Sequence, residues 1–107
     1  MEFYELRQYK VLPDKLDGWV QFMEQEIIPF QISKGMVITG SFRGETDPLV
    51  YVWTRRFESE EQRVALYAAV YESEFWKIQI APRIDEYLDR SGIVVTRLVP
   101  TSKSTMR

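Results

Sequence analysis

The sequence predicts an α+β domain of the ferredoxin-like type, a split βαβ plan in which helices cover one face of a four-stranded antiparallel sheet. The 107 residues, 45% of them hydrophobic, are enough for one core and too few for two domains of usual size. Segments of period-two and of three- to four-residue hydrophobic spacing follow one another as strand, helix, strand, strand, helices, strand. This order is the reason for the predicted fold.

The first strand and the first helix have the clearest patterns. Residues 3–11 alternate as in a strand, and Pro13 follows where a helix can begin. One apolar helix face is then indicated by three- and four-residue spacing of Leu16, Trp19, Val20, Met23, Ile27 and Phe30. Pro29 lacks a backbone donor, so we expect a kink or a loosened last turn before Gly35 ends the helix.

Two further strands are predicted to form a hairpin. Residues 36–43 read as a strand in which Gly40 indicates a bulge. Residues 44–48 have the composition of a turn. Residues 49–57 are rich in β-branched and aromatic side chains and form the strongest strand prediction of the chain.

The second half begins with a helix and ends with a strand. Ser59 and Gln62 have the spacing of a capping box at a helix start. Pro82 is expected to begin a short helix over residues 83–89, and residues 93–99 are predicted to be the last strand. We therefore expect one domain, residues 1–100, and a flexible polar tail, residues 101–107.

The strand period also predicts which residues lie on the face of the sheet that the helices cover and which lie on the uncovered face. If the helices cover Tyr4, Leu6, Val50 and Val52, the uncovered face carries Phe3, Tyr9, Tyr51 and Trp53. Such an apolar patch is unusual on a monomer, and a second copy related by a twofold axis would bury it. The sequence thus predicts a homodimer with facing sheets.

The candidate site lies on the first strand, where Glu5, Arg7 and Tyr9 share one face. In the catalytic interpretation Arg7 holds an anion or carbonyl, Tyr9 donates a hydrogen bond, and Glu5 is a base or orienting group. In the structural interpretation Glu5 and Arg7 form a partly buried ion pair that sets the dimer register. The candidate ligand-binding residues are Tyr51, Trp53, Arg55 and Arg97. The alternative places the two aromatic residues in the dimer core and at least one arginine in solvent.

The composition excludes several classes of function. The chain has no histidine and no cysteine, so no serine–histidine triad, thiolate metal site or histidine-ligated haem can be built. We expect no metal and no cofactor. A net charge of -2 disfavours nucleic acid as a partner. No apolar stretch approaches the roughly 20 residues that span a bilayer, so no membrane span and a cytoplasmic location are expected.

The sequence resembles the NIPSNAP family, a branch of the dimeric α+β barrel superfamily. The resemblance is carried by Tyr4-Glu5-Leu6-Arg7-x-Tyr9, Pro13-x-Lys15-Leu16, Trp19, Gly35, Gly40-x-Phe42, Val52-Trp53 and Arg63. Asp47 and Tyr51 stand where this family often has an asparagine and a histidine, so no role of that histidine carries over. The resemblance implies a ferredoxin-like fold, a homodimer and a cavity, for a family whose activity is poorly defined.

Two classes of function remain from the sequence. The first is a dimeric barrel that binds a small organic molecule, with an anion as one option, between its sheets. Cofactor-independent chemistry by Glu5, Arg7 and Tyr9 would be possible there. The second is a non-enzymatic interaction or structural dimer whose barrel interior is packed. A cavity lined by Glu5 and Arg7 would favour the first class.

Overall fold

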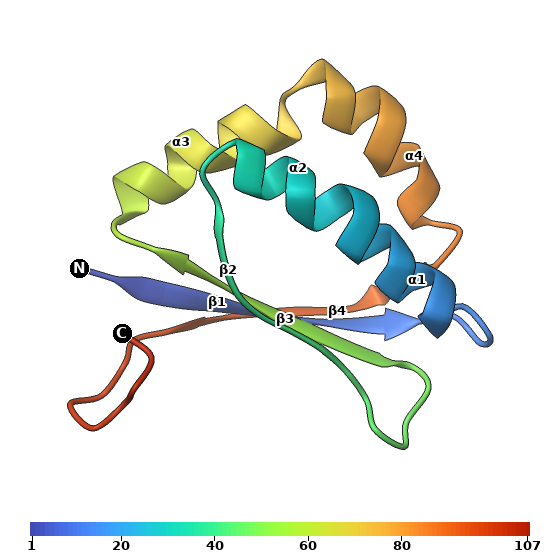
Figure 1. Cartoon of the computed structure of the whole chain (residues 1–107), viewed down its shortest axis with the longest axis horizontal. Coiled ribbons are helices and arrows are strands. Elements are labelled where there is room, and N and C mark those ends of the chain that lie inside the picture. Colours follow the sequence, from blue (N-terminus) through green and yellow to red (C-terminus); the bar gives the residue numbers. More distant parts are fainter.

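The computed structural model describes residues 1–107 and has a helical layer on one face of a single sheet (Figure 1). The strands are β1 (Phe3–Val11), β2 (Val37–Arg43), β3 (Val50–Phe57) and β4 (Leu88–Leu98). They form a four-stranded sheet in the order β2-β3-β1-β4, and every neighbouring pair is antiparallel. The α+β ferredoxin-like fold predicted from the sequence is confirmed.

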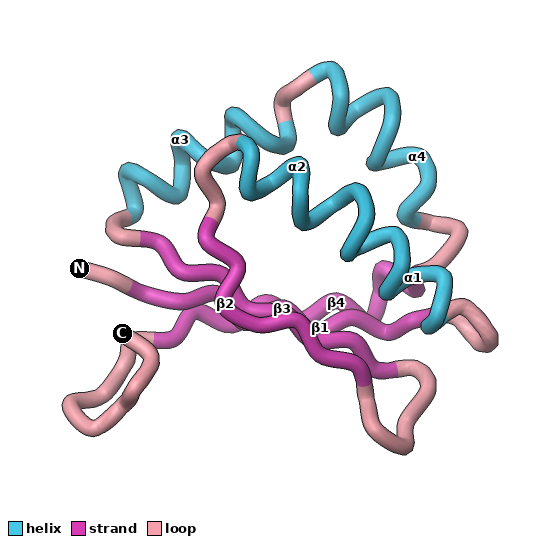
Figure 2. The backbone as a smooth tube through the Cα atoms, viewed as in Figure 1, coloured by secondary structure: helices cyan, strands magenta, loops and turns pink.

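All helices lie on one side of the sheet (Figure 2). They are α1 (Leu16–Phe22), α2 (Ile28–Ser33), α3 (Glu60–Tyr71) and α4 (Ala81–Ile84). A π turn, Met23–Ile27, joins α1 to α2, and a second π turn, Trp76–Ile80, precedes α4. None of the helices is long and apolar enough to cross a bilayer.

Several local features follow the sequence. Gly35 has φ +105°, as the residue that ends α2 requires. The Ser59 hydroxyl accepts the backbone N–H of Gln62 at 3.0 Å and caps α3. The β2–β3 register shifts between Ile38 and Gly40, which confirms the bulge predicted there.

The two π turns have a common cause in proline. Each turn ends two residues before a proline, Pro29 in one case and Pro82 in the other. A proline ring collides with the carbonyl four residues earlier in a regular helix. That carbonyl belongs to Gln25 or to Ile78, and both lie inside the π turns. The loosened turn expected near Pro29 therefore precedes the proline rather than following it.

The predicted faces of the sheet were wrong. Phe3, Glu5, Arg7, Tyr9, Tyr51, Trp53, Arg55 and Phe57 lie under the helices. Tyr9, Tyr51 and Trp53 pack with Trp19 and neighbouring helix residues in the main core. Both faces of these strands are rich in apolar side chains, so alternation alone did not decide which face the helices cover.

The open face of the sheet is also apolar, but with other residues than expected. Gln8 pairs with Val52 on one side and Val94 on the other, and Val52 pairs with Phe42. Phe42 is 59% exposed. The β2–β3 turn and the C-terminal residues extend beyond the sheet on this side (Figure 1).

The last strand begins earlier than predicted. It starts at Leu88, which pairs with Val11, so the helix expected over residues 83–89 ends at Ile84.

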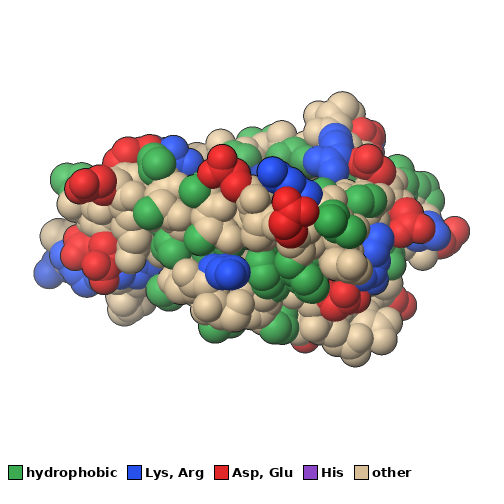
Figure 3. Space-filling view, turned by 90° about the horizontal axis from the view of Figure 1, so that it is seen from above, with side chains coloured by type: hydrophobic (Ala, Val, Ile, Leu, Met, Phe, Trp, Pro, Cys, Tyr) green, Lys and Arg blue, Asp and Glu red, His purple; other side chains and the backbone are tan.

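The outer surface of the helices forms the side of the molecule opposite the open face of the sheet, and it mixes acidic, basic and hydrophobic side chains (Figure 3). It shows no concentration of one charge.

Candidate functional site

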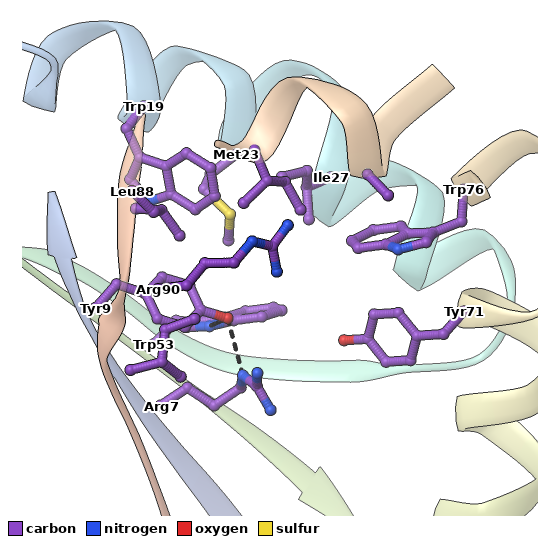
Figure 4. Close-up of a pocket in the computed structure, with 13 residues that line it drawn as sticks. Arg7, Tyr9, Trp19, Met23, Ile27, Trp53, Tyr71, Trp76, Leu88 and Arg90 are labelled. Carbon is purple, nitrogen blue, oxygen red and sulfur yellow. Dashed lines mark hydrogen bonds between the residues drawn. The ribbon is translucent and has the colours of Figure 1, made fainter. Parts of the chain in front are cut away.

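A cavity of about 180 Å³ lies between the helices and the sheet (Figure 4). The strands contribute Arg7, Tyr9, Trp53, Leu88, Arg90 and Ile93 to its wall. The helices and π turns contribute Trp19, Met23, Ile27, Tyr71, Trp76, Ala81 and Ile84. The wall is thus mainly apolar and aromatic, with a few polar groups, as is usual for sites that bind small molecules.

Arg7 brings a positive charge to this wall without a carboxylate partner. Its Nε donates to the Tyr9 hydroxyl at 2.8 Å, and its Nη1 lies 3.5 Å from the Tyr67 hydroxyl. It makes no salt bridge, whereas the other cation of the wall, Arg90, is paired with Asp85. Arginine remains charged in proteins, so the cavity holds one uncompensated cation.

Glu5 and Arg55 form a buried ion pair directly beside the cavity. They are cross-strand partners in β1 and β3, and Arg55 Nη2 donates to Glu5 Oε1 at 2.9 Å. The Arg55 side chain is 0% exposed. The ion pair expected between Glu5 and Arg7 was therefore wrong in its partner, and it links two strands of one chain.

Three further side chains complete this network from the helices. Tyr67 donates its hydroxyl proton to Glu5, with its oxygen 2.7 and 2.9 Å from the two carboxylate oxygens, and accepts from Arg55 Nη2 at 3.0 Å. Arg55 Nη1 donates to Gln31 Oε1 and to the Tyr71 hydroxyl, each at 2.9 Å. The network joins α2 and α3 to the centre of the sheet.

Tyr9, Tyr51 and Tyr67 remain protonated at neutral pH. Burial raises the pKa of Tyr9, and the charge of Arg7 only partly opposes this effect. Burial likewise raises the pKa of Tyr67, and it raises the pKa of Tyr51 to about 12. These phenols can therefore donate hydrogen bonds.

The structure separates the residues that the sequence grouped into one site. Arg7, Tyr9 and Trp53 line the cavity. Glu5 and Arg55 lie next to it in the buried network, with their charged groups bonded to each other.

Two of the expected ligand-binding residues lie away from the cavity. Tyr51 is buried under α1, where its hydroxyl bonds to Ser41 at 2.5 Å. Arg97 is half-exposed, pairs with Glu60 at 2.6 Å and stacks on Phe3. Neither residue reaches the cavity wall.

Sequence reasoning missed the residues that α2 and α3 supply. Tyr67 and Tyr71 are four residues apart and so share one helix face, but they read as ordinary apolar positions. Gln31 follows Ile27 by four residues and is fully buried. Gln31 could have been found from the sequence, because it is a polar residue at a position of the helix face that is otherwise apolar.

The fold and the cavity define a ferredoxin-like α+β protein with a small, mainly apolar site between its helices and its sheet. A NIPSNAP family protein from Agrobacterium tumefaciens has the same fold with a TM-score of 0.88, at 20% identity over 100% of both chains. A NIPSNAP-like domain protein from Burkholderia xenovorans matches with a TM-score of 0.85 and 25% identity, over 96% of this chain and 88% of its own.

A second NIPSNAP family protein from Agrobacterium tumefaciens, of unknown function, matches with a TM-score of 0.87 and 22% identity, over 99% of this chain and 94% of its own. The resemblance to the NIPSNAP family is thus confirmed by structure, and the chain has the fold of NIPSNAP proteins. No protein-family model and no curated protein matches the sequence.

Proposed function

We propose that this chain is a NIPSNAP family protein that binds a small organic anion in the cavity between its helices and its sheet. The observation that carries the proposal is Arg7, a half-buried guanidinium on an apolar wall with no carboxylate partner. Leaving a charge in such surroundings without a counter-ion is costly. A bound anion would compensate it through charge-assisted hydrogen bonds.

The size of the cavity limits the ligand. An apolar cavity of about 150 Å³ holds a benzene-sized molecule. At about 180 Å³ this cavity has room for one ring with a small charged group. The aromatic side chains of Trp19, Trp53 and Trp76 supply apolar surface for such a ring.

Binding is better supported than turnover. Glu5, the base expected from the sequence, lies outside the cavity wall, and its carboxylate already accepts from Arg55 and Tyr67. We assign it the role of holding Arg55 and Tyr67 in place. Chemistry in the cavity would then be limited to stabilising a developing oxyanion by Arg7 and Tyr9.

The experiment is a calorimetric titration with benzoate, a ring with one carboxylate. We expect the wild-type chain to bind benzoate and Arg7→Met to bind it at least about tenfold more weakly, the value of a hydrogen bond to a charged group. Arg97→Met is the matched control, because this half-exposed arginine lies away from the cavity. Absence of binding to the wild type, or equal binding by Arg7→Met, would contradict the proposal.

We also propose a homodimer formed through the open face of the sheet. Phe42, Val94 and Leu98 are exposed there, beside the partly buried Val52. A twofold partner would cover this surface, which is the most common way in which homo-oligomers form. The non-enzymatic alternative needs only this dimer and no ligand, so the benzoate titration separates the two functions.

A further inference from the structure

The hydroxyl proton of Tyr9 has no acceptor within the protein. Its oxygen accepts from Arg7 Nε at 2.8 Å and from Trp53 Nε1 at 3.0 Å. Both nitrogens are donors only, so Tyr9 must be the acceptor in both bonds. A phenol still has one proton to donate, and no other protein group lies within hydrogen-bond distance of this hydroxyl.

Tyr71 is in the same situation. Its oxygen accepts from Arg55 Nη1 at 2.9 Å and lies 3.3 Å from Gln31 Nε2. The orientation of the Gln31 amide is fixed, because Gln31 Oε1 accepts from Arg55 and the amide nitrogen must then face Tyr71. The Tyr71 oxygen therefore accepts two hydrogen bonds, and its own proton has no acceptor within the protein.

A comparison with Tyr67 shows that hydroxyl protons without an acceptor are found at the tyrosines that line the cavity. Tyr67 also accepts from Arg55, but its proton goes to Glu5, and it does not line the cavity. Tyr9 and Tyr71 do line it, and their hydroxyls point toward one another across it (Figure 4). The indole N–H of Trp19, another wall residue, is buried and also without a partner. Buried donors without acceptors are rare in folded proteins.

We propose that Tyr9 and Tyr71 select the ligand by donating their hydroxyl protons to its carboxylate, which lies beside the guanidinium of Arg7. This inference rests on the proposed function and narrows the ligand to a carboxylic acid with a one-ring body. A carboxylate has two oxygens with several acceptor sites, so it can take both phenol protons and a guanidinium proton together. Each phenol is polarised by the arginine that donates to it, which strengthens its own donation.

The test compares benzoate with nitrobenzene, an uncharged molecule of the same shape. Binding of each is measured by calorimetry to the wild type, Tyr9→Phe and Tyr71→Phe. We expect each variant to bind benzoate at least about tenfold more weakly and to lose clearly less affinity for nitrobenzene, because the nitro oxygens are neutral and weaker acceptors than a carboxylate. Tyr51→Phe is the matched control, since this buried phenol bonds to Ser41 outside the cavity. It should leave both affinities unchanged.

The outcomes separate this inference from the proposed function. If the wild type binds benzoate and both variants bind it equally well, the role of the phenols is overturned and the anion site stands. If a variant loses nitrobenzene and benzoate to the same extent, the inference is also overturned, because the hydroxyl then shapes the cavity without selecting charge. If the wild type binds neither molecule, the proposed function fails and this inference fails with it.

Discussion

Arg55 makes more side-chain bonds than any other residue near the site, to Glu5, Gln31, Tyr67 and Tyr71. Its guanidinium also lies 4.7 Å from the centre of the Trp53 ring. It therefore has two structural effects. It compensates the charge of Glu5, and it fixes the tyrosine oxygens of α3 relative to the cavity.

Replacing Arg55 by methionine should be strongly destabilising. The change leaves the Glu5 carboxylate buried without a countercharge, and breaking one side of a buried pair costs about 3–5 kcal/mol. Urea unfolding followed by circular dichroism measures this loss. The double variant Glu5→Leu with Arg55→Met should recover part of it, because no buried charge remains. Additive losses in the double variant would contradict this account of the pair.

At the residue scale, the sequence predicted which polar residues of β1 share one face, but it did not predict the ion-pair partner of Glu5. The alternation of β1 placed Glu5, Arg7 and Tyr9 on one face, and the structure confirms that they share it. The partner of Glu5 was not predictable from β1 alone. Arg55 is 50 residues further along the chain, and only the β1–β3 register brings it opposite.

The π turns are the elements that shape the cavity. Met23 and Ile27 come from the first and Trp76 from the second, and all three line the wall. π turns are frequently found at functional sites. Here each one is explained by a proline that follows it.

Pro29→Ala and Pro82→Ala should each weaken benzoate binding and also lower stability, because buried core residues that precede each π turn would be displaced. Alanine removes the collision with the earlier carbonyl, so the π turn can relax to an α turn and rotate the wall residues before it by about 100°. Calorimetry measures the affinity and thermal unfolding the stability. Pro48→Ala, in the β2–β3 turn, is the control. Unchanged affinity in both helix variants would show that the π turns do not depend on these prolines.

Element types were predictable because each segment has a clear hydrophobic period, and the glycine and serine signals at Gly35, Gly40 and Ser59 were confirmed. The π turns were not predictable, because they preserve nearly the same apolar spacing as an α-helix. The start of β4 was missed for a different reason. Pairing of Leu88 with Val11 is a tertiary contact that overrides the local pattern.

At the scale of the whole molecule, the fold was predictable, but the face of the sheet that the helices cover was not. Both β1 and β3 carry apolar residues on each face, so either face satisfied the pattern. The covered face is determined by packing with the helices, since Trp19 and Phe22 share a core with the aromatic residues of β1 and β3. The site therefore lies within one chain and does not need the second copy.

The proposed dimer predicts that a charge on the open face prevents association. Wild-type protein should sediment as a dimer, and Phe42→Glu as a monomer of 12.7 kDa. Ile78→Glu is a matched control, because Ile78 is 61% exposed, close to the 59% of Phe42, but belongs to the helical layer. A wild-type monomer at micromolar concentration, or a Phe42→Glu dimer, would contradict the prediction.

The central claim is that the cavity between the helices and the sheet is an anion site. A crystal structure of the protein grown with benzoate tests it most directly. We predict that the ring lies among Trp19, Trp53 and Trp76, with its carboxylate within hydrogen-bond distance of Arg7, Tyr9 and Tyr71. Benzoate bound elsewhere, or a cavity that contains only water at saturating benzoate, would contradict the claim.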